Sequence, residues 1–334
     1  MREVMFYEKK EKGLVTCRVC PKICSIPEGK AGFCRVRENR GDVLYALNYG
    51  RVTSGGLDPI EKKPLYHFYP GSYIQSFGSF GCNLRCGFCQ NWTIAHGDPP
   101  ARELTPRQAV DMARQEPDRG YRNIGIAYTY NEPFMWYEFI ADTAPLAHQA
   151  GLKNVLVTNG YVSETPLREI LPYIDAMNID VKGFTDRYYR KNCAGRLEPV
   201  LRTVEIARGK CHVELTTLLV TGLNDTQEEI SRLVDWVASL DREIPLHFSR
   251  YFPNFEVDLP PTPLETLERA RQTALEKLSY VYIGNAPNLG AGDTVCPDCG
   301  EKLIVRRGYS TQVAGLDGKK CRRCGREIRI EGIT

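Results

Sequence analysis

The chain has 334 residues, 42% of them hydrophobic and 25% charged, and 44 basic against 41 acidic residues give a formal charge of +3. This composition excludes an intrinsically disordered chain, and the near balance of charge argues against nucleic-acid binding by the chain as a whole. No apolar stretch approaches the ~18 residues of a membrane span and residues 1–11 lack a signal-peptide core, so we expect a cytoplasmic protein without membrane contact.

Cysteines are the most informative feature of the chain, because eleven of the thirteen fall into three tight clusters. Clustered cysteines in a chain without an export signal indicate metal or iron–sulfur ligation rather than disulfides. The clusters divide the chain into a Cys-rich N-terminal segment over 1–73, a central region over 74–290 and a four-cysteine ribbon over 291–334. Cys193 and Cys211 lie outside the clusters, and we assign them to packing.

The N-terminal cluster has the spacing C-x2-C-x3-C-x9-C and consists of Cys17, Cys20, Cys24 and Cys34. Four thiolates make a complete ligand set, although the spacing matches no ferredoxin run. A zinc site and a second, electron-relaying iron–sulfur cluster both fit these residues.

The central region alternates short apolar strands with amphipathic helices. We expect strands over 73–78, 123–130, 153–158, 176–182, 212–220, 244–249 and 280–283, and helices over 106–115, 134–150, 166–173, 199–208, 227–240 and 263–278. This alternation predicts parallel βαβ units, which right-handed crossovers curl into a barrel. The predicted fold class is α/β, a partial (β/α)6 TIM-type barrel with its chemistry at the carboxyl ends of the strands.

Three cysteines with the spacing C-x3-C-x2-C, namely Cys82, Cys86 and Cys89, follow the first of these strands. Three thiolates leave one iron of a [4Fe–4S] cluster with an open coordination position, whereas the usual set of four closes the site. An open position is what makes a metal site reactive. A zinc knuckle is the alternative.

This spacing, with the aromatic Phe88 before the last cysteine, resembles the signature of the radical S-adenosylmethionine (SAM) superfamily. The segments GCNLRCGFCQNW, DPIEKKPLYHF and HFSRYFP are similar to the AmmeMemoRadiSam-system radical SAM proteins, relatives of pyruvate formate-lyase activating enzyme. The resemblance implies that SAM chelates the unique iron of a [4Fe–4S] cluster. It also implies that an electron from the cluster cleaves SAM to methionine and a 5′-deoxyadenosyl radical, which abstracts a hydrogen atom from the substrate.

The resemblance assigns SAM contacts to the ends of the second and third strands. In the superfamily a Gly-Gly-Glu segment holds the SAM amino group; here Asn131 and Glu132 end the matching segment, and Tyr130 and Asn131 stand in place of the glycines. Alternatively, Glu132 has no role at the cofactor and is a loop residue before a helix, where the helix dipole favours a negative charge. Thr158 and Asn159 match the Thr-Asn-Gly segment that the resemblance places at the cofactor.

Further contacts are expected on the fourth and sixth strands. Asp180 and Lys182 match an Asp-x-Lys segment of activating-enzyme relatives, and their spacing of two places both on one face of a strand. A structural ion pair is the alternative, because buried charges are costly unless paired or bound to a ligand. We place His247 at the end of the sixth strand as a pocket ligand or hydrogen-bond donor, with a satisfied core histidine as the alternative.

The C-terminal cluster has the spacing C-x2-C-x21-C-x2-C, formed by Cys296, Cys299, Cys321 and Cys324. Two knuckles with two thiolates each suit a tetrahedral structural zinc, and a rubredoxin-like iron takes the same ligands. The surrounding residues are basic, which favours either a solvated surface or RNA contact.

Taken with the resemblance, these motifs predict a radical SAM oxidoreductase that acts on a protein, in the manner of a glycyl-radical activating enzyme. Modification of RNA or of a small metabolite is the second hypothesis. A non-catalytic iron–sulfur or zinc scaffold, or a redox sensor, is an alternative of a different class. The expected partners are a protein substrate, a flavodoxin- or ferredoxin-type electron donor and proteins of the Memo and AMMECR types.

Overall fold

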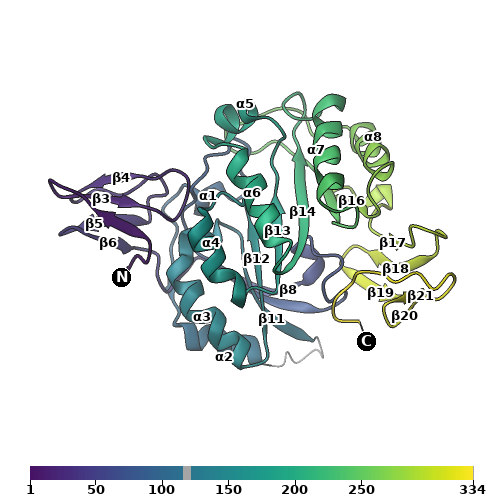
Figure 1. The fold of residues 1–334 in the computed structure, drawn as a ribbon, viewed down its shortest axis with the longest axis horizontal. Coiled ribbons are helices and arrows are strands. Elements are labelled where there is room, and N and C mark those ends of the chain that lie inside the picture. The colour runs from purple at the N-terminus through teal and green to yellow at the C-terminus, as the bar shows by residue number, and fades with distance from the viewer. Residues whose placement is uncertain (116–121, 334) are drawn as a thin grey trace.

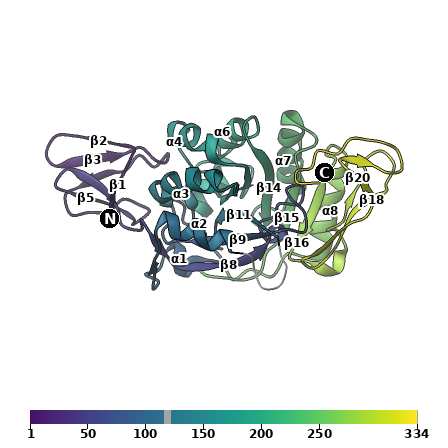
Figure 2. The same ribbon diagram turned by 90° about the horizontal axis from the view of Figure 1, so that it is seen from below.

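The computed structural model describes residues 1–115 and 122–333. A central α/β layer carries a small β-rich module at each end, the N-terminal one at the left of Figure 1 and the C-terminal one at the right. The same arrangement is visible from below in Figure 2. None of the helices in the described ranges has the length and apolar character to cross a bilayer.

An eight-stranded sheet forms the centre of the molecule, in the order β16-β15-β14-β13-β12-β11-β9-β8 within the described residues. Neighbouring strands from β9 to β16 pair in parallel, and β8 joins the edge antiparallel to β9. The bounds are β8 (Ser54–Pro59), β9 (Tyr73–Gly78), β11 (Asn123–Tyr128), β12 (Lys153–Thr158), β13 (Ala176–Asp180), β14 (His212–Leu219), β15 (Leu246–Arg250) and β16 (Val281–Gly284). The predicted α/β fold with a parallel sheet is confirmed. The strand order runs from β16 at one edge of the sheet to β8 at the other.

Helices connect the parallel strands. They are α1 (Trp92–Ala95), α2 (Pro106–Arg114), α3 (Tyr137–Gln149), α4 (Glu164–Ile170), α5 (Asp186–Tyr188), α6 (Glu198–Ala207), α7 (Gln227–Leu240) and α8 (Leu264–Leu275). Six of them correspond to the six predicted, whereas α1 and α5 are additional short helices. Thr105 caps α2 through a capping box with Gln108, and Pro106 occupies the first helical position, as the sequence predicts. The helix predicted over 134–150 begins instead with a 3₁₀ turn over Pro133–Trp136.

The segment between β8 and β9 packs against the sheet rather than forming a separate unit. Ile60, Leu65 and Phe68 share a buried cluster with Val155 and Ala176. In the predicted organisation, Ile60, Leu65, Phe68 and β8 belong to the N-terminal segment over 1–73. In the structure the main sheet therefore begins at residue 54, since β8 pairs with β9 over its whole length.

Short antiparallel strands build the two end modules. The N-terminal module contains β1 (Arg2–Glu3), β2 (Tyr7–Lys9), β3 (Leu14–Cys17), β4 (Ser25–Pro27), β5 (Arg37–Arg40) and β6 (Val43–Ala46), while β7 (Arg51–Val52) pairs with β10 (Arg102–Glu103). The C-terminal module contains β17 (Thr294–Val295), β18 (Lys302–Arg307), β19 (Ser310–Val313), β20 (Leu316–Asp317) and β21 (Lys320–Cys321). The C-terminal module docks on the α/β layer, and an ion pair of 2.8 Å joins Arg326 to Glu243.

Candidate functional site

The central cysteine loop leaves the carboxyl end of β9, where the sequence predicts it. Cys86 is buried, while Cys82 and Cys89 are partly exposed. The backbone amide of Leu84 donates to Sγ of Cys82 over 3.4 Å, and that of Cys89 donates to the Cys86 carbonyl over 3.1 Å. Phe88 is buried beneath the loop.

Cys193 is fully buried in the core, as expected of a packing residue, and it lies against this loop. It closes a π-helical turn over Tyr189–Cys193, and its carbonyl accepts from the amide of Arg85 over 2.8 Å. A hydrogen bond from the Cys86 thiol to Cys193, together with burial, raises the pKa of Cys86 well above its usual range. The π-helical turn frequently marks a functional site, but its contact with Cys86 is a tertiary one that spacing does not reveal.

Glu132 lies where β11 ends, and its carboxylate is buried. Oε1 accepts from the Thr158 hydroxyl over 2.7 Å and from the Phe134 amide over 3.0 Å, and Oε2 accepts from the Asn159 amide over 2.8 Å. Burial raises the pKa of Glu132 to about 7, against the lowering effect of these hydrogen bonds. The structure thus brings together three residues that the sequence assigned to the cofactor.

Asn159 connects this carboxylate to the cysteine loop. Its Nδ2 lies 3.6 Å from Sγ of Cys82 and 2.9 Å from Oδ1 of Asn83. Asn83 in turn donates to the Tyr161 carbonyl over 2.5 Å. Asn83 is not among the predicted site residues, because only its position directly after the first cysteine distinguishes it in the sequence.

Asn131 positions the loop from the other side. Its Oδ1 accepts from the Ser79 amide over 2.9 Å, and its Nδ2 donates to the Gly81 carbonyl over 3.0 Å. The side chain that replaces a family glycine therefore ties the end of β11 to the segment that enters the cysteine loop.

Asp180 and Lys182 form an ion pair of 3.0 Å at the carboxyl end of β13, with 34% and 18% of their side chains exposed. Burial lowers the pKa of Lys182, but the Asp180 carboxylate and the nearby thiols outweigh it and hold the pKa well above its usual range. Because Cys86 is one of the groups that raise the pKa of Lys182, the Lys182 ammonium lies close to the cysteine loop. The ion pair corresponds to the structural alternative considered for these residues, and Lys182 lies two residues beyond the end of β13 rather than within the predicted strand.

His247 is not at a strand end, and the expectation that it stands there is wrong. It is the second residue of β15, which continues to Arg250. Its Nε2 lies 2.6 Å from Oε2 of Glu214, a fully buried carboxylate that also accepts from His212 over 2.9 Å. His247 therefore matches the alternative, a buried histidine whose ring forms a hydrogen bond within the core.

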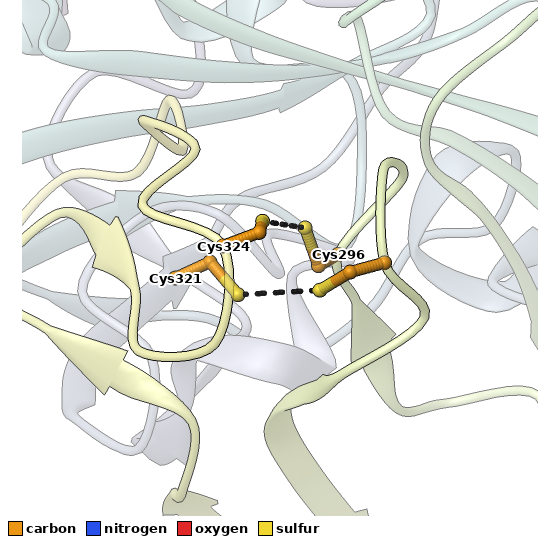
Figure 3. A group of neighbouring side chains, drawn as sticks. Cys296, Cys321 and Cys324 are labelled. Carbon is orange, nitrogen blue, oxygen red and sulfur yellow. Dashed lines mark hydrogen bonds between the residues drawn. The ribbon is translucent and has the colours of Figure 1, made fainter.

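The C-terminal cysteines converge on one point. Figure 3 shows thiols from two facing loops pointing toward each other. The Sγ atoms of Cys296 and Cys324 are 3.5 Å apart, those of Cys299 and Cys321 are 3.6 Å apart, and all four lie within 4.8 Å of one another. A tetrahedral zinc, ~2.3 Å from each sulfur, needs sulfurs about 3.8 Å apart, so this group fits one tetrahedral ion.

The central cysteines fit an iron–sulfur cluster. Three thiolates leave one iron of a [4Fe–4S] cluster with an open position, and an amide donor to sulfur, such as that of Leu84 to Cys82, is typical of iron–sulfur sites. The donor set and the buried Glu132 beside it fit a [4Fe–4S] cluster with a ligand bound at its open iron.

Comparisons with known proteins agree with this geometry. The model of the radical SAM superfamily matches residues 77–237. The chain is 48% identical over 339 residues to the uncharacterized protein MJ0808 of Methanocaldococcus jannaschii, covering 99% of each. It is 24% identical over 212 residues to the pyruvate formate-lyase-activating enzyme of Clostridium pasteurianum, covering 59% of this chain and 86% of that enzyme.

Among solved structures, SuiB of Streptococcus suis bound to S-adenosylmethionine matches with a TM-score of 0.53 at 14% identity. The match covers 70% of this chain and 54% of SuiB, and at this identity it shows the fold alone. With its C-x3-C-x2-C loop at the end of β9 and its match over residues 77–237, the chain belongs to the radical SAM superfamily, whose cofactors are a [4Fe–4S] cluster and SAM.

Proposed function

We propose that this radical SAM protein abstracts a hydrogen atom from a protein substrate, as the activating enzymes among its relatives act on proteins. The observation that carries the proposal is the exposure of the cysteine loop. Cys89 is partly exposed, and Gln90, Asn91 and Trp92 directly after it lie at the surface. A site that opens on the surface suits a macromolecule better than a small metabolite, which needs an enclosing cavity.

An aromatic surface borders this opening. Trp92 is 39% exposed, and its ring stacks on Phe255 with centroids 5.2 Å apart and an interplanar angle of 14°. The loop that carries Phe255 is fixed to the cysteine loop, because the Glu256 amide donates to the Gly87 carbonyl over 2.9 Å. Exposed aromatic groups of this kind are typical of protein-binding surfaces.

When bound and reduced, a [4Fe–4S] cluster held by these cysteines would supply the electron for reductive cleavage of SAM. The residues of this chain would bind and orient the cofactors. Cys82, Cys86 and Cys89 would hold three irons, and Glu132 would receive the SAM amino group. The pair of Asp180 and Lys182 would contact the polar groups of the same ligand.

Two kinds of partner belong to this proposal. A flavodoxin- or ferredoxin-type protein would supply electrons, since a cluster of such low potential needs a low-potential donor. Proteins of the Memo and AMMECR types are further proposed partners, on the strength of the sequence resemblance described above.

The test is anaerobic formation of 5′-deoxyadenosine by reconstituted protein with SAM and a reductant. Cell extract is added as separate protein, RNA and small-molecule fractions, and Cys86→Ala serves as the cluster-free control. We expect the protein fraction to raise turnover above the uncoupled background. Stimulation by the RNA or small-molecule fraction alone would assign the substrate to that class instead, and absence of any product with an intact cluster would leave a scaffold function.

A further inference from the structure

We propose that Cys17, Cys20, Cys24 and Cys34 hold a second [4Fe–4S] cluster, which passes electrons to the one at Cys82, Cys86 and Cys89. The ligation stands on the geometry of the N-terminal module. The electron transfer rests on the proposed function, because a radical SAM cluster must be reduced before each cleavage.

The four N-terminal thiols line one cavity. Cys17 ends β3 and Cys24 precedes β4, and the Cys17 amide donates to the Cys24 carbonyl over 3.0 Å. The other residues that line the cavity include the apolar Val19, Ile26 and Met135 and the basic Lys22 and Arg37. Apolar walls around four thiols shield a bound group from water, as iron–sulfur clusters of low potential require.

Four cysteines are a complete ligand set for a [4Fe–4S] cluster as well as for one tetrahedral ion, and all four N-terminal cysteines line this cavity. The apolar walls and the N–H groups that face the thiols favour the cluster.

Arg37 supplies a second, independent indication. Its side chain is 1% exposed and lines the cavity, and Nη1 binds Glu138 over 3.1 and 3.0 Å. Nη2 lies 3.4 Å from the Phe134 carbonyl, but the buried Nε has no hydrogen-bond partner within the described part of the chain. A buried N–H donor without a partner is costly, and a thiolate or sulfide of a cluster in this cavity would accept from it.

The charges and donors around the cavity also suit an anionic group. Arg37 lines the same cavity as Cys17 and Cys34, so its guanidinium charge faces the space between the proposed ligands. The Phe33 amide already donates to Sγ of Cys24 over 3.5 Å. Such N–H donors to sulfur are typical of iron–sulfur sites.

The N-terminal cavity shares a wall with the central cysteine loop. Gly81 has a φ of +88°, and a Cβ at this position would lie 2.8 Å from the Cys34 carbonyl oxygen and 2.6 Å from Cγ1 of Val36. Glycine is therefore required for the loop to approach Cys34 so closely. Asn83 lines the cavity and also binds Asn159, whose amide contacts Cys82.

This proximity supports electron transfer, because the rate of tunnelling falls steeply with distance. One electron would leave the reduced N-terminal cluster and enter the oxidised cluster at Cys82, Cys86 and Cys89. A flavodoxin- or ferredoxin-type protein would then return one electron to the N-terminal cluster. No atoms are transferred, and each step oxidises one centre while reducing the next.

The ligation is tested without SAM or substrate, so its failure is distinct from failure of the proposed function. A variant with Cys82→Ala, Cys86→Ala and Cys89→Ala leaves the N-terminal residues intact and is reconstituted anaerobically with iron and sulfide. We expect it to retain about four irons and about four sulfides per chain, with the Mössbauer spectrum of a [4Fe–4S] cluster. Adding Cys20→Ala and Cys24→Ala to this triple variant should remove the bound iron and sulfide. Adding Cys211→Ala instead is the matched control and should leave both in place.

Sulfide distinguishes the outcomes, because the single ion at the C-terminal cysteines brings none. Wild-type protein provides a second measurement, with about eight sulfides per chain expected rather than about four. Zinc or iron bound in the triple variant without sulfide would overturn the proposal, and so would a wild-type sulfide content of about four.

The relay is tested by the electron source. In a Cys20→Ala, Cys24→Ala variant, 5′-deoxyadenosine formation is measured with reduced flavodoxin and, in parallel, with dithionite, which reaches exposed clusters directly. We expect the rate with flavodoxin to fall about tenfold further than the rate with dithionite. Equal losses with the two reductants would overturn the relay.

Discussion

The side-chain amide of Asn159 lies 3.6 Å from the sulfur of Cys82 and donates a hydrogen bond to it. The backbone amide of the same residue donates to Glu132 over 2.8 Å. The residue at the end of β12 therefore joins a proposed iron ligand to the carboxylate proposed to receive the SAM amino group. An N–H···S bond withdraws electron density from a ligating thiolate, which raises the reduction potential of the cluster.

Replacing Asn159 with Ala should lower the potential of the cluster at Cys82, on the order of tens of millivolts, because the donor to the sulfur is lost. An anaerobic redox titration followed by electron paramagnetic resonance measures the change. The matched control is Asn154→Ala on the same strand, whose amide instead donates to the Ala144 carbonyl over 2.9 Å. A potential that moves equally in both variants would contradict the role of Asn159.

Glu132→Gln should weaken SAM binding to the cluster-loaded protein about 10- to 100-fold, because a charge-assisted hydrogen bond to the ammonium becomes a neutral one. Equilibrium dialysis with labelled SAM measures the affinity. Glu164→Gln, at an exposed glutamate on α4, is the control.

The pH dependence of SAM binding should identify the same carboxylate. Because burial raises the pKa of Glu132 to about 7, the carboxyl is protonated below that pH and cannot attract an ammonium group. SAM affinity of the wild-type protein should therefore rise as the pH increases through about 7. If Glu132→Gln retains this rise, another group is responsible.

His67 should make folding sensitive to acid. Burial lowers its pKa to about 4, and its ring lies between the Tyr282 hydroxyl at 2.7 Å and the Arg329 carbonyl at 3.0 Å. Below about pH 6.5 the unfolded chain binds a proton that the folded chain excludes, so the free energy of unfolding falls by up to about 3 kcal/mol as the pH drops toward 4.

Urea unfolding at several pH values between 7.5 and 4.5 measures this loss. His67→Gln removes the titrating ring and should make the free energy of unfolding less dependent on pH, although the variant is less stable at neutral pH. An unchanged slope would show that other groups govern the acid sensitivity.

The C-terminal cysteines should hold about one zinc or iron ion per chain, with no sulfide. Removing the ion with a chelator should lower the melting temperature, because its ligands join two loops that otherwise depend on a small core. Metal analysis and thermal denaturation of the wild type and of Cys299→Ser measure both effects. A Cys299→Ser variant with full metal content and unchanged melting would contradict the site.

Local sequence patterns predicted most of the α/β layer. The bounds predicted for β9, β12 and α7 match the structure, because apolar periodicity and capping residues are local features. β8 was missed, since its sequence SGGLDP contains two glycines and no apolar alternation. It forms a strand because β9 offers it an edge to pair with.

The sequence by itself determined the chemistry of the cysteine loop, because ligands close together in the chain must lie close together in space. It did not place Cys193 against Cys86 or Asn159 against Cys82, and it put His247 at the carboxyl end of a strand in which it is the second residue. Those relationships join residues far apart in the sequence. They depend on strand register and on the crossovers that bring strand ends together, so only the tertiary structure decided them.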